Sequence, residues 1–266
     1  MSDELAMPSF NLNGKTAIIT GGTRGLGWGI AATFAAFGAN VVITARTEAD
    51  CEKVSREIGA KYCRGGSCLG LAADSTKQAD IDRVIEATEE AFGELDILVN
   101  NASITGKSAN ILSDYCDEEN FDKVVTTNLK GVFLFSKAAA SHMRHRGRGG
   151  KIINIASVYG VIGARGEAAF GAAAAGVISL TRTMANEFAQ QGITVNAVCP
   201  GYIVTPMNTD ILESGFIKSR LEGETALGRL AKIEDITGPV LAMASDCFNY
   251  MTGAYILLDG GQTIKG

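Results

Sequence analysis

Several features that would place the chain in a special class are missing from its sequence. Its 266 residues contain no continuous apolar run of about 18, so no membrane-spanning helix is expected. The first ten residues are polar and acidic, unlike a secretory signal peptide. Neither internal repeats nor a linker rich in proline or serine divides the chain. These absences favour one soluble, cytoplasmic domain over residues 1–266.

An excess of positive charge and a clear metal-binding motif are also missing. Lys and Arg total 24 against 29 Asp and Glu, which gives a formal net charge of −5. The basic cluster at residues 144–151 is rich in glycine and is interpreted as a solvated loop, so no nucleic-acid partner is expected. Cys63 and Cys68 frame a short loop without a Cys or His nearby, which favours reduced thiols over a metal site. His142 and His145 are interpreted as surface residues.

Short apolar runs alternate with helical patterns along the whole chain. Strands are expected at residues 16–20, 40–44, 68–72, 97–99, 151–155, 194–198 and 254–258. Helices are expected at residues 29–37, 48–58, 81–92, 121–144, 168–190 and 236–244. This alternation predicts an α/β fold of Rossmann type, with a doubly wound parallel sheet in a three-layer αβα domain. Such sheets bind ligands beyond the carboxyl ends of their strands.

A glycine-rich turn, TGGTRGLG at residues 20–27, follows the first predicted strand and precedes the first helix. Glycines allow the backbone to turn tightly and approach a pyrophosphate, and the helix N-terminus favours its negative charge. This context predicts a dinucleotide site. No carboxylate follows the second strand until Glu48, although an acid there would bind the 2′-hydroxyl of NAD. Arg24 and Arg46 suit a 2′-phosphate instead, so the sequence favours NADP(H) over NAD(H).

Taken together, residues 14–261 resemble the short-chain dehydrogenase/reductase family. The turn matches the family's TGxxxGxG motif, and Asp74 matches the acid that holds the adenine amino group. NNAS at residues 100–103 resembles the family's NNAG, with Ser103 in place of glycine. The resemblance implies cofactor contacts from Gly21, Thr23, Arg24, Gly25, Leu26, Gly27, Arg46, Thr47, Asp74, Asn101, Ala102, Ser103, Pro200, Gly201, Ile203 and Thr205.

The catalytic positions of the family are only half filled. Ser157, after KIINIA, matches the catalytic serine, and Asn128 matches the helix asparagine that anchors a water. The family's YxxxK motif is expected to begin thirteen residues after the serine, where this chain has Phe170, followed by Ala174 at the lysine position. Tyr159 lies too close to Ser157 to begin an alternative motif, because position 163 is glycine.

In the family, the tyrosine transfers the hydroxyl proton, and the lysine lowers its pKa from about 10. Loss of a positioned acid or base costs about 10²–10⁴-fold in rate, so turnover close to undetectable is expected with the fold and cofactor binding retained. Two origins of Phe170 and Ala174 fit the sequence. The chain is either an engineered inactive variant or a natural pseudoenzyme that senses NADP(H). The engineered variant is favoured, because Phe170 and Ala174 are minimal deletions of the reactive groups.

The substrate is less well defined by the sequence. Ser103, Val158, Tyr159, Arg165 and Met207 are the candidate lining residues, and residues 203–230 are expected to form a flap over the site. The resemblance to gluconate, polyol, hydroxysteroid and 3-oxoacyl members favours a small secondary alcohol or its ketone, of sugar-acid, polyol or hydroxysteroid type. Alanine-rich helix faces and family habit imply a homotetramer, with a dimer as the alternative.

Overall fold

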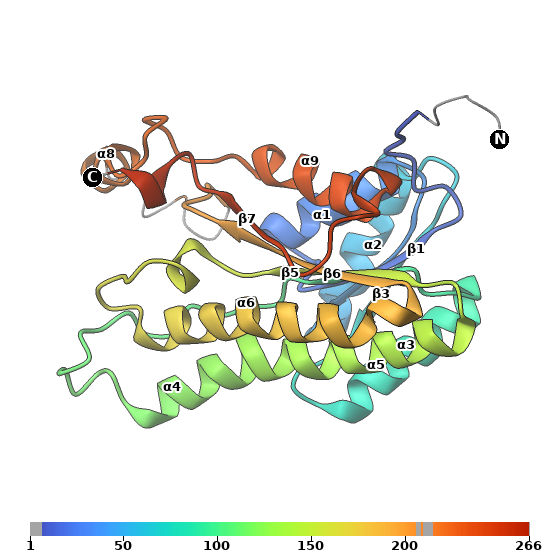
Figure 1. Ribbon diagram of the computed structural model, residues 1–266, viewed down its shortest axis with the longest axis horizontal. Coiled ribbons are helices and arrows are strands. Elements are labelled where there is room, and N and C mark those ends of the chain that lie inside the picture. Colours follow the sequence, from blue (N-terminus) through green and yellow to red (C-terminus); the bar gives the residue numbers. More distant parts are fainter. Residues whose placement is uncertain (1–6, 206–208, 210–214, 266) are drawn as a thin grey trace.

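Seven parallel strands form the centre of the protein in the computed structural model, which describes residues 7–205, 209 and 215–265 (Figure 1). Their order in the sheet is β3-β2-β1-β4-β5-β6-β7. The strands are β1 (Thr16–Thr20), β2 (Asn40–Ala45), β3 (Cys68–Ala72), β4 (Ile97–Asn100), β5 (Gly150–Ile155), β6 (Ile193–Pro200) and β7 (Tyr255–Leu258). The order reverses between β1 and β4, which is where a doubly wound sheet opens a crevice for ligands.

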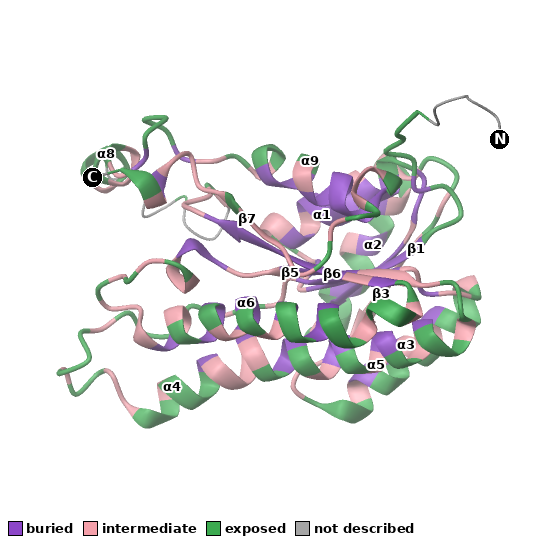
Figure 2. Cartoon of the chain, in the orientation of Figure 1, coloured by how far each residue is buried: buried purple, intermediate pink, exposed green. Residues whose placement is uncertain are grey.

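Two layers of helices cover the sheet (Figure 1). Helices α1 (Gly25–Ala36), α2 (Glu48–Tyr62) and α9 (Ile233–Ala244) pack on one face, and α3 (Gln78–Phe92), α5 (Gly131–Arg146) and α6 (Ala168–Phe188) on the other. Neighbouring residues of one strand therefore enter different cores, as Ile18 and Ile19 do. The helix faces turned away from the sheet are largely exposed in Figure 2. The predicted three-layer Rossmann-type fold is confirmed.

The expected strands are found within about two residues of their predicted ends, whereas five of the six expected helices differ by three or four residues at one end. Helix α1 begins at Gly25 rather than at residue 29, because its first turn contains two glycines, which have low helix propensity. The single helix expected at 121–144 begins at Glu118 as α4 (Glu118–Val125), where the Asp117 carboxylate caps the amide of Asn120. A π-helical turn, Thr126–Lys130, then separates α4 from α5.

Helix α6, with the turn that follows it, is long and apolar enough to span a membrane by length and composition alone. Its Met184 and Ala185 belong to the core cluster that contains Val195 of β6, so it serves as a core helix of a soluble fold. Trp28 packs edge-on against Tyr62 in the layer formed by α1 and α2. His142 is not a surface residue, because its side chain is 10% exposed and lies near Glu89.

Candidate functional site

Three glycines make the turn after β1 fit a bound phosphate. Gly21 and Gly25 have φ angles of +66° and +56°, which favour glycine strongly. A Cβ atom on Gly27 would lie 2.3 Å from the carbonyl oxygen of Gly21, so the start of α1 packs directly on the turn. Little surrounds Gly25, whose added Cβ would meet only Thr205, at 3.8 Å. The turn therefore leaves an open cradle at the N-terminus of α1.

Asn101 ties this turn to the end of β4. Its side-chain amide donates to the carbonyl oxygens of Thr20 (2.9 Å) and Gly21 (3.2 Å). The Thr20 hydroxyl accepts in return from the backbone amides of Asn101 (2.9 Å) and Ala102 (3.0 Å). These four bonds fix the two loops that border the crevice between β1 and β4.

Positive charge lines the crevice beside the turn. Arg24 occupies the N-cap position of α1, where its guanidinium group cannot accept from the amides of the first turn, and no side-chain cap is formed there. Arg24, Arg46 and Thr47 are exposed, and neither arginine forms an ion pair within the described part of the chain. Unpaired guanidinium groups next to an open helix N-terminus fit an anionic dinucleotide. Leu26 packs against the core below them.

Asp74 follows β3 on the same edge of the sheet. Its Oδ1 accepts hydrogen bonds from the Thr76 amide (3.0 Å) and hydroxyl (2.7 Å). Burial opposes ionisation of this carboxyl, but the bonds from Thr76 and the charge of Lys77 together lower the pKa of Asp74. Its Oδ2 accepts no hydrogen bond from another described residue. A charged oxygen is thus left for a donor such as an adenine amino group.

The segment after β6 crosses above the glycine-rich turn. The amide of Gly201 donates to the Leu258 carbonyl at 3.1 Å, and Ile203 pairs with Ala231 in an isolated bridge. Gly201 has no room for a side chain, since a Cβ there would lie 2.8 Å from Oε1 of Gln262. Pro200 ends β6, and Thr205 approaches Gly25. Of the predicted cofactor residues in this segment, Thr205 therefore lies beside the glycine-rich turn.

Ser157, Phe170 and Ala174 meet beside the same crevice. The Ser157 hydroxyl accepts a hydrogen bond from the Tyr159 amide (3.2 Å) at the start of a 3₁₀ turn, Val158–Gly160. This turn packs on α6, because a Cβ on Gly160 would lie 2.7 Å from the carbonyl carbon of Ala174. Ala174 is 6% exposed. The three predicted catalytic positions are therefore neighbours, with no ionisable group at two of them.

The aromatic ring of Phe170 occupies an apolar setting. It packs against the small cluster of Val124, Ala169 and Ala173. Its centroid lies 6.5 Å from that of Tyr159, with the rings at 82°. Phenylalanine fits here because nothing in this cluster needs a hydroxyl partner. Proton transfer from this position is impossible without the phenol.

Asn128 lies inside the π-helical turn. Its amide nitrogen donates to the Ile104 carbonyl (2.8 Å), and its oxygen accepts from the Ile104 amide (2.9 Å). The side chain thus holds the loop that follows β4 against α4 and α6. The expected water anchor was inferred from resemblance, and the loop contact is an additional role that the sequence pattern missed. π turns of this kind often mark functional sites.

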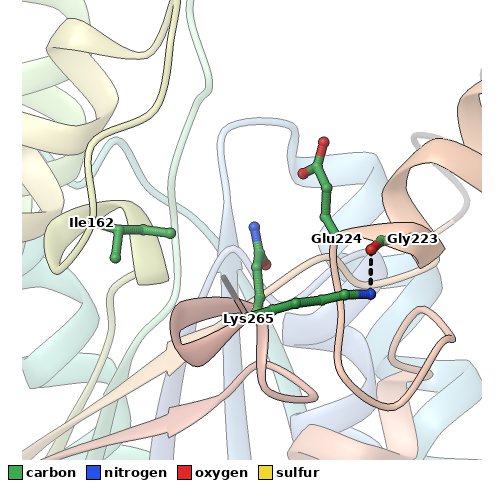
Figure 3. Close-up of a pocket in the computed structure, with 5 residues that line it drawn as sticks. Ile162, Gly223, Glu224 and Lys265 are labelled. Carbon is green, nitrogen blue, oxygen red and sulfur yellow. Dashed lines mark hydrogen bonds between the residues drawn. The ribbon is translucent and has the colours of Figure 1, made fainter.

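A chain of hydrogen bonds that sequence reasoning missed extends from the Ser157 turn. The Tyr159 hydroxyl donates to that of Tyr202 (2.7 Å), which donates to Glu224 Oε2 (3.0 Å). Burial raises the pKa of Tyr159, and burial together with its tyrosine and glutamate neighbours raises that of Tyr202. Beyond this chain lies a cavity of about 300 Å³ lined by Ile162, Gly223, Glu224, Gln262 and Lys265 (Figure 3).

The other predicted substrate-lining residues differ in their exposure to solvent. Ser103 and Arg165 are exposed, whereas Val158 is buried and offers a substrate little surface. Met207 lies outside the described residues. The described part of the predicted flap at 203–230 includes helix α8 (Gly215–Gly223). Across the described ranges, no group of three His, Cys, Asp or Glu residues is arranged to hold a metal ion.

Comparisons with known proteins agree with this geometry. A sequence model of the family described as Enoyl-(Acyl carrier protein) reductase matches residues 21–263. The 3-oxoacyl-[acyl-carrier-protein] reductase FabG of Escherichia coli is 39% identical over 252 residues, covering 95% of this chain and 98% of the relative. A short-chain type dehydrogenase/reductase from Mycobacterium marinum superimposes with a TM-score of 0.88 at 35% identity, covering 96% of this chain and 98% of that one. For a putative short-chain alcohol dehydrogenase from Sinorhizobium meliloti, the TM-score is 0.89 at 35% identity, with coverages of 97% and 100%.

Proposed function

Because the chain belongs to the short-chain dehydrogenase/reductase family, we propose that it binds NADP(H) on a site built to interconvert a secondary alcohol and a ketone. The open cradle at Gly25, the free oxygen of Asp74 and the two unpaired arginines support the cofactor assignment. Arg24 and Arg46 favour NADP(H) over NAD(H), because a guanidinium fork matches a phosphate.

The single observation that carries the proposal about activity is the pair Phe170 and Ala174 next to Ser157. The bound nicotinamide supplies hydride transfer in this family, and the protein must move a proton at the substrate oxygen. In this proposal Ser157 donates a hydrogen bond to that oxygen, whereas Phe170 has no proton to exchange. Ala174 brings no charge to lower a phenol's pKa. The site therefore binds and orients its ligands with little or no turnover.

The parent activity is assigned to alcohols of sugar-acid, polyol or hydroxysteroid type. The relatives named 3-oxoacyl-[acyl-carrier-protein] reductase add a 3-oxoacyl thioester as another ketone to test. An engineered origin of Phe170 and Ala174 accounts for the presence of Ser157, Asn128 and the glycine-rich turn around them. We also propose a cytoplasmic homotetramer, with a dimer as the alternative.

One observation favours a second candidate function. The cofactor cradle is complete while the proton-transfer groups are absent, which suits a natural protein that senses NADP(H) without chemistry. The two candidates differ in what restoring the side chains achieves. An inactivated reductase regains turnover, whereas a sensor gains none and instead changes a partner interaction when the cofactor binds.

The test is a calorimetric titration of NADPH and NADH into this chain and into the double variant Phe170→Tyr with Ala174→Lys. Both proteins are expected to bind NADPH more tightly than NADH, and only the double variant is expected to oxidise NADPH with a ketone. Failure of both proteins to bind NADPH would refute the cofactor assignment. Binding by both, with no turnover of any ketone or alcohol tested, would favour the sensor.

A further inference from the structure

A second cavity, here called the basic cavity, lies far from the cofactor crevice. It has a volume of about 410 Å³ and is lined by Arg144, Gly147, Arg148, Gly149, Gln190, Gln191 and Gly192. Helices α5 and α6 run side by side away from α4 and α8, and the basic cavity lies where both helices end and where β5 and β6 begin (Figure 1). It is therefore at the opposite edge of the sheet from Ser157, and the proposed function does not use it.

The lining of the basic cavity suits an anion. Its seven residues are two arginines, two glutamines and three glycines, so no acidic and no apolar side chain lines it. Arg144 is exposed, and its side chain forms no ion pair or hydrogen bond with another described residue. A guanidinium group presents its N–H donors in a planar fork that matches the oxygens of a phosphate or a carboxylate.

Both helices that end at the basic cavity have capped carbonyl groups. This matters because the C-terminus of a helix carries partial negative charge, which opposes an anion. The Gly147 amide donates to the Met143 carbonyl (3.2 Å) at the end of α5. With its side-chain amide oriented to donate, Gln191 bonds the carbonyls of Glu187 (3.0 Å) and Phe188 (3.2 Å) at the end of α6. These bonds reduce the opposition from the helix ends, so the arginines determine the charge of the cavity.

The two loops that border the basic cavity are fixed against each other by their backbones. Gly149 and Gly192 have φ angles of +74° and +72°, which favour glycine. A Cβ on Gly149 would lie 2.4 Å from the Gly192 carbonyl oxygen, and the Gly150 amide donates to that oxygen at 3.3 Å. The frame of the cavity is therefore formed before a ligand binds, which lowers the cost of binding.

Glu94 is the only carboxylate that forms an ion pair with the cluster of Arg144, Arg146 and Arg148 in the described ranges, and two of them share it. Its oxygens accept from Nη1 of Arg148 (3.0 and 3.1 Å), whereas Nη1 of Arg146 lies 3.6 Å away. Nε and Nη2 of Arg146 are buried without a hydrogen-bond partner among the described residues. A ligand that takes Arg148 leaves Glu94 to Arg146, which offsets the loss of the first pair.

We propose that the basic cavity binds a small multivalent oxyanion, whose phosphate or carboxylate groups bridge Arg144 and Arg148. A single carboxylate would only replace what Glu94 already gives Arg148, whereas a ligand with two or more negative charges also pairs Arg144. The ligand is small, because the cavity holds about 410 Å³ and the chain's net charge of −5 opposes a long polyanion.

Pyrophosphate is the first probe, and calorimetry with this chain measures its Kd. Arg144→Gln and Arg148→Gln are each expected to weaken pyrophosphate about tenfold, because each removes a charge-assisted hydrogen bond. Lys137→Gln is the matched control. Lys137 is exposed two helical turns before Arg144 on the same side of α5, and it does not line the cavity. Its substitution removes the same charge and should change the Kd less than about twofold.

Glu94→Gln gives a change of the opposite sign. It removes the carboxylate that competes with the ligand for Arg148, so pyrophosphate is expected to bind about threefold or more tightly. Citrate and acetate test the ligand class. Citrate is expected to compete with pyrophosphate, which identifies carboxylates as ligands, or to fail, which restricts the site to phosphates. Acetate should bind at least about tenfold more weakly than pyrophosphate, since it has one charge.

The cofactor crevice also attracts phosphates, so the two sites are tested apart. Pyrophosphate is titrated into the chain saturated with NADPH and into the double variant Arg24→Ala with Arg46→Ala, and the Kd at the basic cavity should be the same in both. Absence of pyrophosphate binding, its loss in either of these two samples, an equal Kd for acetate, or a Kd unchanged in both Arg144→Gln and Arg148→Gln would overturn the proposal. Failure of NADPH to bind would remove the proposed function and leave the test in the double variant intact.

Discussion

The contact between Gly27 and the glycine-rich turn gives a prediction with a calculable size. In Gly27→Ala, the new Cβ would lie 2.3 Å from the Gly21 oxygen and 2.4 Å from the Asn101 amide nitrogen. Ordinary contact needs about 1 Å more, so the turn and the Asn101 bonds have to shift. Overpacking of this kind costs about 1–3 kcal/mol of unfolding free energy. The shift also moves the phosphate cradle, so NADPH affinity is expected to fall about tenfold or more.

Gly59 provides the matched control. It lies within helix α2, and a Cβ there would meet nothing within 4 Å. Gly59→Ala is therefore expected to stabilise the protein by about 0.5–1 kcal/mol through helix propensity, with unchanged NADPH affinity. Urea unfolding and NADPH titration of both variants measure the two quantities. If Gly27→Ala matched the unsubstituted chain in both stability and affinity, the proposed packing of α1 on the turn would be wrong.

Other substitutions test the two cofactor arginines, the loop contact of Asn128 and the ion pair between Arg229 and Asp235. Arg24→Ala and Arg46→Ala should each weaken NADPH about tenfold while leaving NADH nearly unchanged, as titration of both cofactors will reveal. Asn128→Ala removes two hydrogen bonds to Ile104 and should cost about 1–3 kcal/mol, with faster hydrogen exchange at the Ile104 amide. Hydrogen bonds from Arg229 lower the pKa of Asp235 to about 2, so this carboxylate's stabilisation is present above about pH 4 and lost as the pH falls through 2. Asp235→Asn should therefore flatten the acid side of the stability profile measured by urea unfolding.

The sheet was predictable because its signals are local. Runs such as TAIIT and NVVIT are β-branched, short and followed by turn residues, so β1 is predicted to the residue and β2 to within one. The turn at 20–27 was equally predictable. Its positive φ angles favour glycine, so the turn is visible in the sequence as closely spaced glycines. Helix α1 shows the limit of local signals, because its first turn contains the very glycines that lower helix propensity.

Features that depend on distant partners were not predictable. The π turn at Thr126–Lys130 accompanies a contact between Asn128 and Ile104, which lie 24 residues apart. The hydrogen bonds of Tyr202 join it to residues 43 and 22 positions away. Neither Tyr202 nor Glu224 belongs to a motif in the sequence, so only the folded chain brings them to the cavity. The low exposure of His142 likewise depends on the packing of α5 near α3, whereas its position at the end of the predicted helix, away from the strand ends, suggested the surface instead.

Introducing the family's lysine alone, as Ala174→Lys, tests how tightly position 174 is packed. Ala174 is 6% exposed on α6 and packs under the Gly160 turn, so Ala174→Lys places an ammonium group where an apolar methyl now fits. Partial burial of this charge should cost about 1–3 kcal/mol without cofactor, moderated by the reach of the side chain toward the open crevice. Burial lowers the pKa of a lysine, so the unfolded chain binds the proton more tightly. The stability of Ala174→Lys relative to the present chain should then rise with pH, a sign that urea unfolding at pH 7 and pH 9.5 can determine.

NADPH should recover part of the loss if the new ammonium contacts the cofactor. Equal stability of the two proteins at both pH values would mean that position 174 faces solvent in the unliganded protein, and that its packing under the Gly160 turn is wrong.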